Sequence, residues 1–254
     1  MIAVELKDIE FAYDNKREQI PILSGVNFDV KEGEFVSFVG ASGSGKSTIF
    51  QIIAGLQQPQ YGSVLLHGAN VQKRLGKVGY MPQQDLLMPW RTVFENARLP
   101  LEMKKLNPRK HREMLHDMLE EFGLGEAKDK YPHELSGGMR QRLSFLRTTL
   151  TEAHILLLDE PFSALDAMTK LFMQEWLLSQ WEKRKQTILF ITHDIQEALF
   201  LSDRIYILDA KPIQQLTEIE VPLQRPRSQK DLQKQEIVQL QHELIESFRT
   251  QVTI

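Results

Sequence analysis

The segment GASGSGKST at 40–48 has the residue types and the spacing that bind phosphate groups. Gly40, Gly45, Lys46 and Ser47 match the pattern G-x-x-x-x-G-K-[ST], and Ala41, Ser42, Gly43, Ser44 and Thr48 complete the segment. In such a loop the glycines let backbone N–H groups face a β-phosphate, the lysine meets the β- and γ-oxygens, and the hydroxyl binds Mg²⁺. The strand-like EFVSFVG before the loop and the apolar TIFQIIAGL after it provide the context that the motif requires.

Two acidic residues, Asp159 and Glu160, follow the apolar run ILLL at 155–158. A buried strand ending there would place Asp159 at the carboxyl edge of a sheet, beside the phosphate loop, where it can hold Mg²⁺ through water. Glu160 would then be placed to polarise an attacking water. An aspartate at a strand end is often only a cap or turn residue, but two acids in a chain with a phosphate loop favour metal binding and a base.

His193 ends the next apolar run, in FITHD, and would reach the same edge of the sheet. A lone histidine is more often structural than catalytic. Here the strand order would bring it within reach of a γ-phosphate, which favours a catalytic role. The other histidines are scattered, and His111 and His116 do not share a helix face, so no metal site follows from them.

The pattern of apolar residues predicts the elements that must position these groups. Strands are expected at 2–6, 26–30, 34–40, 62–66 and 77–81, with a helix at 48–56. The segment 86–150 is mainly helical; its clearest helix is 107–124, where Asn107 is a cap, Pro108 suits the first turn, and Gly123 and Gly125 end the helix. A strand at 153–161, a helix at 168–185, a strand at 185–194 and a helix plus strand at 197–208 follow. This order predicts a parallel α/β core with an inserted helical subdomain.

Composition excludes several classes of protein. The net charge of −3 gives no electrostatic support for a nucleic-acid partner, and none is expected. The absence of cysteine excludes disulfides, iron–sulfur clusters and thiolate zinc sites, and it fits a reducing compartment. The N-terminus is expected to form a strand and not a signal peptide, and the apolar runs are too short to cross a bilayer. The tail at 229–248 predicts a surface-packing helix, with a regulatory role as the alternative.

A second glycine-rich helix start occurs in ELSGGMRQR at 134–142. Ser136, Gly137 and Gly138 before an apolar helix form a plausible anion-binding end. A chain that binds one nucleotide has no evident use for two such sites. The alternative is that the three residues are merely a junction between a loop and a helix.

The ordered set of motifs resembles the nucleotide-binding subunit of an ABC transporter over essentially the whole chain. GASGSGKST resembles the Walker A loop, ILLLDEP the Walker B strand and LSGGMRQR the ABC signature. Gln83 in YMPQQD resembles the Q-loop glutamine, SALD at 163–166 the D-loop with Asp166, and His193 the switch histidine. Tyr13 in FAY matches the aromatic residue that stacks on adenine.

The resemblance implies an α/β fold: a RecA-like P-loop NTPase core with an N-terminal antiparallel β subdomain and an inserted helical subdomain. It implies a nucleotide-binding domain at 1–228, with the helical subdomain at about 86–150, and a C-terminal helix at 229–254. It also implies an ATP-dependent dimer of two identical chains, in which Ser136, Gly137 and Gly138 contact the nucleotide of the other copy. Such an arrangement explains the second glycine-rich helix start, because hydrolysis would then release the dimer.

The same resemblance assigns roles in ATP hydrolysis. ATP and Mg²⁺ are expected at Lys46, Ser47, Asp159 and Gln83, where Gln83 can touch the metal or the attacking water. Glu160 would activate the water and His193 would stabilise the γ-phosphate. Met139 departs from the family pattern, which most often has glutamine there, so a ribose or cross-dimer polar contact is in doubt.

The segment DLLMPWRTVFENARLPLE at 85–102 is similar to the nitrate, sulfonate and taurine importer group, which includes carriers of thiamine-precursor pyrimidines and riboflavin. That group implies a separate membrane permease, an extracytoplasmic solute-binding protein and a position on the cytoplasmic face of the plasma membrane. Met88, Pro89 and Trp90 would lie near the groove for the permease; the alternative is a core position for Trp90. A transport-independent ABC ATPase of the cell-division or repair type and a P-loop kinase or GTPase are the rival functions.

Overall fold

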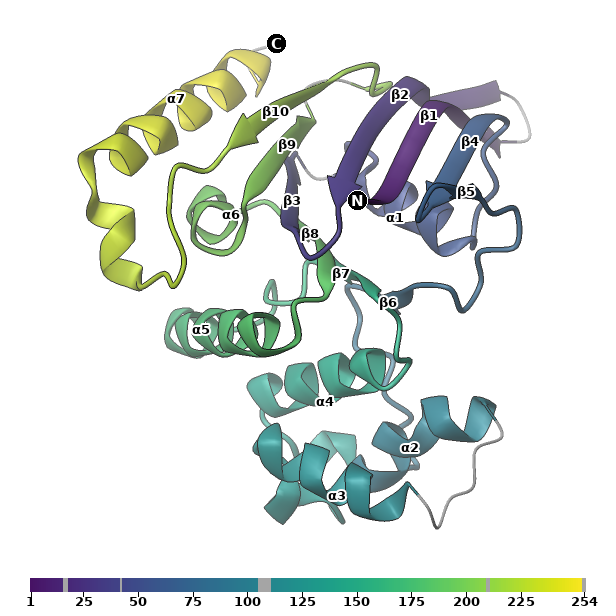
Figure 1. Cartoon of the computed structure of the whole chain (residues 1–254), viewed down its shortest axis with the longest axis vertical. Coiled ribbons are helices and arrows are strands. Elements are labelled where there is room, and N and C mark those ends of the chain that lie inside the picture. Colours follow the sequence, from purple (N-terminus) through teal and green to yellow (C-terminus); the bar gives the residue numbers. More distant parts are fainter. Residues whose placement is uncertain (16–17, 42, 105–110, 209–210, 253–254) are drawn as a thin grey trace.

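The computed structural model describes residues 1–15, 18–41, 43–104, 111–208 and 211–252 (Figure 1). Its strands are β1 (Ile2–Asn15), β2 (Glu18–Lys31), β3 (Phe35–Gly40), β4 (Tyr61–Leu66), β5 (Ala69–Asn70), β6 (Gly79–Met81), β7 (Ile155–Asp159), β8 (Thr187–Thr192), β9 (Arg204–Leu208) and β10 (Leu216–Glu220). Its α-helices are α1 (Lys46–Ala54), α2 (Val93–Met103), α3 (Arg112–Glu121), α4 (Gly137–Thr149), α5 (Ala167–Arg184), α6 (Ile195–Leu201) and α7 (Gln235–Val252).

The larger sheet holds the strands that lead into the predicted site. Its order is β10-β9-β3-β8-β7-β6, and all pairs are parallel except β10 with β9. Every residue of β3, β7 and β8 is buried, as expected for parallel strands that are covered on both faces. Because β8 lies between β3 and β7, the loops after these three strands meet at one edge of the sheet.

The smaller sheet is antiparallel, with the order β2-β1-β4-β5, and a hydrophobic cluster joins it to α1 and the larger sheet. The predicted strands at 2–6 and 26–30 are each much longer in the structure. The two strands pair from Ile2↔Lys31 to Asn15↔Glu18, and shifts of register interrupt the pairing several times. Such shifts break the alternation of apolar and polar residues, so the sequence pattern reveals only part of each strand.

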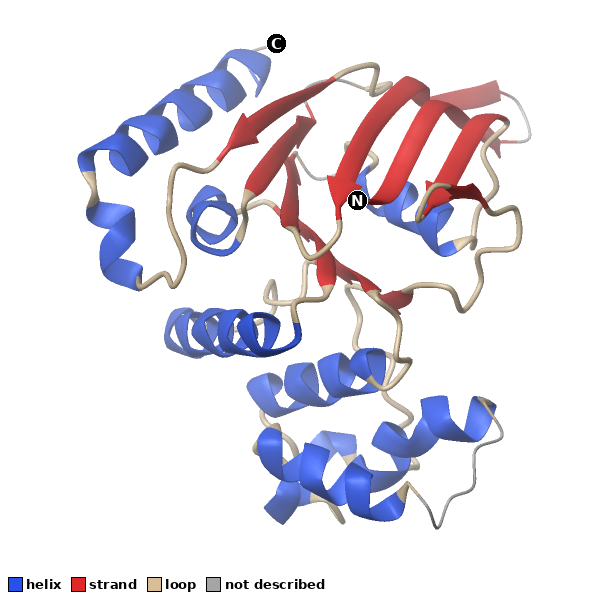
Figure 2. Ribbon diagram, in the orientation of Figure 1, coloured by secondary structure: helices blue, strands red, loops and turns tan. Residues whose placement is uncertain are grey.

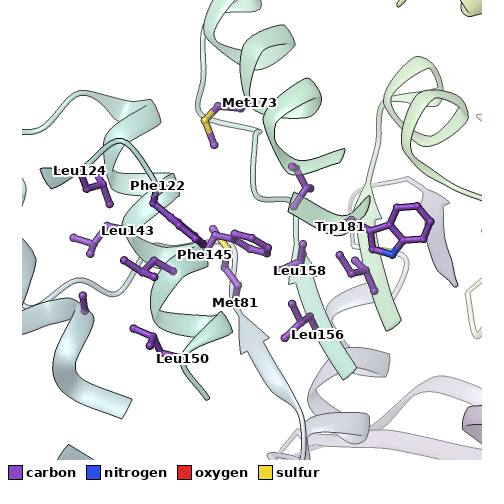
Figure 3. Packing of buried hydrophobic residues seen from close by; sticks show 14 of the residues in the cluster. Met81, Phe122, Leu124, Leu143, Phe145, Leu150, Leu156, Leu158, Met173 and Trp181 are labelled. Atoms are coloured by element: carbon purple, nitrogen blue, oxygen red, sulfur yellow. The ribbon is translucent and has the colours of Figure 1, made fainter. Parts of the chain in front are cut away.

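The helices α2, α3 and α4 form a separate subdomain between β6 and β7, in the lower half of Figure 1. Its core joins the larger sheet, and Figure 3 shows Phe122 and Phe145 close to Met81 and Leu158 of the strands. The predicted helix 107–124 is observed as α3, which begins at Arg112 and ends at Glu121. Asn107 and Pro108 lie outside the described residues.

The C-terminal tail differs from the single helix expected from 229. A short 3-10 helix at Gln229–Gln233 comes first, with a capping box between Ser228 and Asp231, and α7 begins only at Gln235. Ile237 and Leu244 of α7 are buried in a cluster with α6 and β9, so this helix packs on the surface of the core (Figure 2). In the described ranges, no helix is long and apolar enough to cross a membrane.

Candidate functional site

The phosphate loop connects β3 to α1 at the carboxyl edge of the larger sheet. Gly45 has φ 109°, and a Cβ atom there would lie 2.7 Å from Ile22 Cγ2. A Cβ on Gly40 would lie 3.0 Å from the carbonyl oxygen of Leu208. The positive φ and the close contact favour glycine at 45, and the tight contact leaves little room for a side chain at 40. Gly43 also has a positive φ, whereas Ser42 lies outside the described residues.

The lysine of the loop is buried against the loop itself. Lys46 is 4% exposed, and its Nζ donates hydrogen bonds of 2.8 Å to the carbonyl oxygens of Gly40 and Ala41. Burial lowers the pKa of Lys46, while the charges of Glu160 and Asp159 act in the opposite direction. Ser44 Oγ is buried and has no hydrogen-bond partner in the described part of the chain. A desolvated ammonium and an unpaired hydroxyl in one loop suit an anionic ligand.

Asp159 lies beside the loop, as predicted, and is 3% exposed. Its carboxylate accepts hydrogen bonds from Ser47 Oγ at 3.2 Å and from the Tyr80 hydroxyl at 3.3 Å. Burial raises the pKa of Asp159, and the hydrogen bond from Ser47 opposes that shift. A carboxylate and a hydroxyl oxygen at this distance are ligands of the kind that Mg²⁺ prefers, so the donor set fits this ion. The sequence analysis did not identify Tyr80, because no motif marks a tyrosine at this place.

The three predicted catalytic side chains converge next to Asp159. Glu160 accepts a hydrogen bond from Gln83 Nε2 at 3.2 Å, and its Oε2 lies 3.5 Å from His193 Nδ1. Glu160 has φ 45°, an uncommon conformation for a residue with a side chain, and its N–H donates to the carbonyl oxygen of Ile191 at 3.0 Å. These residues come from the ends of β6, β7 and β8, so the parallel order of the strands brings them together.

Tyr13 is near the first turns of α1, next to the phosphate loop. Its hydroxyl lies 3.3 Å from Thr48 Oγ1 and donates to Gln51 Oε1 at 3.3 Å. The ring packs edge-on against Phe11, and the residue is 39% exposed. An exposed ring face beside the phosphate loop provides a surface on which a planar base can stack.

The second glycine-rich segment lies apart from the phosphate loop, although Gly137 lines one pocket with Gln83. Ser136 is the exposed N-cap of α4, and its Oγ accepts a hydrogen bond of 3.3 Å from the Met139 N–H. A Cβ on Gly137 would lie 3.1 Å from Leu165 Cδ2, so this turn packs closely on the 163–166 segment. Figure 1 shows α4 in the helical subdomain and α1 beside the sheets. The Met139 side chain packs against the core of the subdomain.

Asp166, the other predicted residue on this side, is the N-cap of α5. Its carboxylate accepts a hydrogen bond of 3.1 Å from the Thr169 N–H, and hydrogen bonds from the Thr169 side chain and then from its N–H lower the pKa of Asp166. A Cβ on Gly138 would lie 3.0 Å from Thr169 Cγ2. The segments 136–138 and 163–166 therefore form one continuous surface.

The segment after Gln83 is held by the helix that begins with the second glycine-rich segment. Arg147 of α4 donates to the carbonyl oxygens of Asp85 and Leu86, the latter at 2.8 Å, and Arg140 forms an ion pair of 3.5 Å with Asp85. The sequence analysis missed these anchors. Trp90 is 72% exposed, so the alternative that placed it in the core is wrong.

A phosphate loop between β3 and α1, with two carboxylates at the end of a parallel strand, defines a P-loop nucleotide-hydrolysing protein. The profile of a family described as "ABC transporter" matches residues 23–163, which is more than half of the chain. The chain therefore belongs to the ABC transporter family, and it is an ATP-binding ATPase. The kinase and GTPase alternatives are wrong.

Several relatives share most of their length with this chain. The formylaminopyrimidine import ATP-binding protein ThiZ of Halalkalibacterium halodurans is 44% identical over 230 residues, which cover 91% of this chain and 89% of the relative. The aliphatic sulfonates import ATP-binding protein SsuB of Bacillus cereus is 39% identical over 236 residues, which cover 93% of each chain. The chain is thus similar in sequence to ATP-binding proteins of import systems.

A solved structure agrees with the fold. The dimeric ATP-binding cassette MJ0796 in a post-hydrolysis state, bound to ADP and Pi, matches with a TM-score of 0.75 and 31% identity. The match covers 87% of this chain and all of that one. The predicted fold class is therefore confirmed.

Proposed function

We propose that this chain is the ATP-hydrolysing motor subunit of an importer and that it drives a separate permease. The observation that carries the proposal is the position of Gln83. It contacts Glu160 at the site of hydrolysis, and the segment that follows it is held by α4 of the helical subdomain. A change at the phosphate end of the site is thereby linked to the part of the chain that would contact a permease.

The nucleotide binds at the phosphate loop. Lys46 exchanges its two carbonyl partners for oxygens of the β- and γ-phosphates, and the backbone N–H groups of 40–48 surround the β-phosphate. Tyr13 stacks on the adenine. Ser47 and Asp159 hold Mg²⁺ together with Gln83, and the ion neutralises charge on the phosphate oxygens when it is bound.

Hydrolysis depends on the three side chains that meet next to Asp159. Glu160 accepts a proton from the water that attacks the γ-phosphate, and Gln83 helps to orient that water. His193 stabilises the charge that develops on the γ-phosphate oxygens. The contacts of 3.2 Å and 3.5 Å around Glu160 support these roles, because they show that one site holds all three groups.

A second copy of the chain completes each site. Ser136, Gly137 and Gly138 bind the γ-phosphate of the nucleotide held by the partner, and Asp166 lies at the same interface. Near Asp166, α5 exposes Met168 and Phe172 by 61% and 62%, and large exposed apolar residues favour a protein partner. The dimeric form of the similar cassette supports this assembly.

The permease contacts the exposed residues after Gln83. Leu86 and Trp90 are 59% and 72% exposed, and an exposed tryptophan beside a segment linked to the site suits a protein contact. The assembly includes an extracytoplasmic solute-binding protein, so the chain works as a peripheral subunit on the cytoplasmic face of the plasma membrane. The names of the relatives favour pyrimidine-type or sulfonate-type solutes, and the chain itself does not contact the solute.

These roles correspond to a nucleotide-binding domain at 1–228, with the helical subdomain at about 86–150 and a C-terminal helical segment at 229–254. The regulatory alternative for this segment has less support, because its helix is packed on the core through Ile237 and Leu244.

Mixing two inactive variants tests the shared site. Lys46→Ala removes the phosphate-loop half, and Ser136→Ala removes the hydroxyl of the signature half without adding bulk that would block closure. In a head-to-tail dimer of one chain of each kind, one composite site has both halves intact. We therefore expect ATP hydrolysis to return when the two variants are mixed, although neither hydrolyses ATP alone. A mixture as inactive as its components argues against a site shared between copies.

The proteins that co-purify with this chain distinguish an importer subunit from a transport-independent ABC ATPase. The tagged chain is isolated in detergent from the cells that produce it, and its partners are identified by mass spectrometry. A hydrophobic permease is the expected partner, and ATP hydrolysis should respond to its presence. Recovery of soluble partners only would favour the cell-division or repair type.

A further inference from the structure

A group of charged residues links the helix after the D-loop to the turn that carries His193. Lys170 lies in the first turn of α5, where its backbone N–H donates to the carbonyl oxygen of Asp166 at 2.8 Å. Its ammonium donates to Asp194 Oδ2 at 2.7 Å and lies 3.5 Å from Glu197 Oε1. Asp194 directly follows His193, so one side chain connects the two segments.

The two carboxylate oxygens of Asp194 accept hydrogen bonds from different partners. Oδ1 accepts hydrogen bonds from the N–H groups of Gln196 and Glu197, at 2.9 Å and 3.2 Å, and so caps α6. Oδ2 is left for Lys170. The orientation of this carboxylate is therefore determined from both sides, and the backbone that joins it to His193 is held against α5.

The ammonium of Lys170 is shared by one partly exposed and one buried carboxylate. The side chains of Lys170, Asp194 and Glu197 are 20%, 36% and 3% exposed, and Gln174 Nε2 donates to Glu197 at 3.0 Å. Burial acts to lower the pKa of Lys170, but Asp194 and Glu197 overcome this effect and raise it. The geometry of Asp194 is fixed by its three hydrogen bonds, and removing Lys170 would leave the buried charge of Glu197 without its cation.

From these contacts we infer that Lys170 is a positioning residue for His193. It fixes the His193 turn against α5, so that the imidazole stays next to Glu160 and the D-loop and the His193 turn move together. This inference rests on the proposed role of His193 in hydrolysis. The structural alternative is that Lys170 only compensates the charge of buried Glu197.

The first test measures kcat and KM for ATP in Lys170→Met, which keeps the aliphatic stem but removes the charge. We expect kcat to fall about 10-fold with KM within about 2-fold of the parent, because misplacing a catalytic group affects the chemical step more than binding. Lys170→Arg should restore most of the turnover. Lys183→Met serves as the control, since Lys183 lies on the same helix and pairs with Glu121 at an exposed position. A parental kcat in Lys170→Met would overturn the inference.

A second variant separates positioning from charge compensation. In Lys170→Met combined with Glu197→Gln, no buried charge is left unpaired, and the amide can still accept the hydrogen bond from Gln174. Thermal unfolding should show a midpoint near that of the parent. Turnover should remain as low as in Lys170→Met, because the link to Asp194 is still missing. Recovery of kcat in this double variant would assign Lys170 to charge compensation and overturn the inference.

A double-mutant cycle with His193→Ala distinguishes this inference from the proposed function. If Lys170 acts through His193, adding Lys170→Met to His193→Ala should change the single-turnover rate by less than about 2-fold. A further loss equal to that in the parent background would show that Lys170 acts elsewhere. Parental turnover in His193→Ala would refute the role of His193 itself. Reduced turnover in His193→Ala together with parental turnover in Lys170→Met would refute only the inference about Lys170.

Discussion

The two glycine-rich helix starts of this chain, at α1 and at α4, have the same local chemistry but different surroundings. Lys46 and Asp159 at the first are 4% and 3% exposed and bond to neighbouring strands and loops. Ser136 at the second is exposed, and its side chain caps its own helix. The groups around the first helix start are buried within one chain, whereas the side chain of Ser136 at the second is exposed. A short motif therefore does not reveal which molecule supplies its ligand.

The difference follows from what each helix packs on. The loop before α1 extends from β3, a fully buried strand, so its position is determined by the core of the sheet. The start of α4 belongs to the helical subdomain, and Arg147 joins that helix to the segment after Gln83. The subdomain joins the sheet through a shared hydrophobic cluster and through the segments after β6 and before β7. Under the proposed function, this is the part that would move to close on a partner.

Glu160→Gln should have the largest effect on ATP hydrolysis, and it acts at the buried site next to α1. Turnover is expected to fall about 10²- to 10⁴-fold, because the general base is lost while the shape of the site is kept. ATP binding should remain, and size-exclusion chromatography with ATP should show a trapped dimer. Glu236→Gln, the same change at an exposed position of α7, is the control. Normal hydrolysis would refute the assignment of Glu160 as the base.

Ser136→Arg should affect the helix start at α4 and leave the phosphate loop at α1 unchanged. The large cation is expected to block closure, so ATP-dependent dimerisation should disappear and turnover should fall by about 100-fold or more. The affinity of the monomer for ATP should be unchanged, since Ser136 does not contact the phosphate loop. Ser179→Arg introduces the same side chain at an exposed serine of α5. Unchanged dimerisation of Ser136→Arg would count against a role in trans.

Arg147→Met should weaken the attachment of α4 to the segment that follows Gln83. Removing the guanidinium leaves the carbonyl oxygens of Asp85 and Leu86 without these donors, which should lower the free energy of unfolding by about 1–3 kcal/mol. Urea unfolding measures this change, and KM for ATP should stay near the parental value. Arg98→Met, which breaks a more exposed ion pair with Glu102, is the matched control. Equal losses in both variants would show that the Arg147 anchor has no special importance.

Trp90→Ala should have the smallest effect on the isolated chain. Because the side chain is 72% exposed, the free energy of unfolding should change by less than about 0.5 kcal/mol, and basal turnover should be maintained. Binding to the permease should weaken by about 2 kcal/mol, as measured by the amount recovered in detergent pull-downs over a concentration series. Loss of basal turnover together with permease binding would refute the docking role.

The sequence predicted the phosphate loop, the two carboxylates and His193 because these residues follow apolar strands in a parallel core, where one edge collects every loop. Their neighbours were less predictable. Tyr80 and Arg147 contact the site or its loop through packing between β6, β7 and α4, and no local pattern identifies such contacts. The length of β1 and the start of α7 were also missed, since register shifts and a capping box override the apolar periodicity.

The chemical groups of this protein can be identified from its residues alone: a glycine loop, a lysine, a hydroxyl and two acids at spacings that local backbone geometry makes specific. Which of these groups lie in contact depends on the packing of the strands. Gln83, Glu160 and His193 are far apart along the chain and lie within 3.5 Å contacts only because β7 packs between β6 and β8. Packing also leaves Trp90 exposed and lets Lys170 reach Asp194. Local motifs encode groups that are neighbours along the backbone, whereas burial and long-range contacts depend on how whole elements pack.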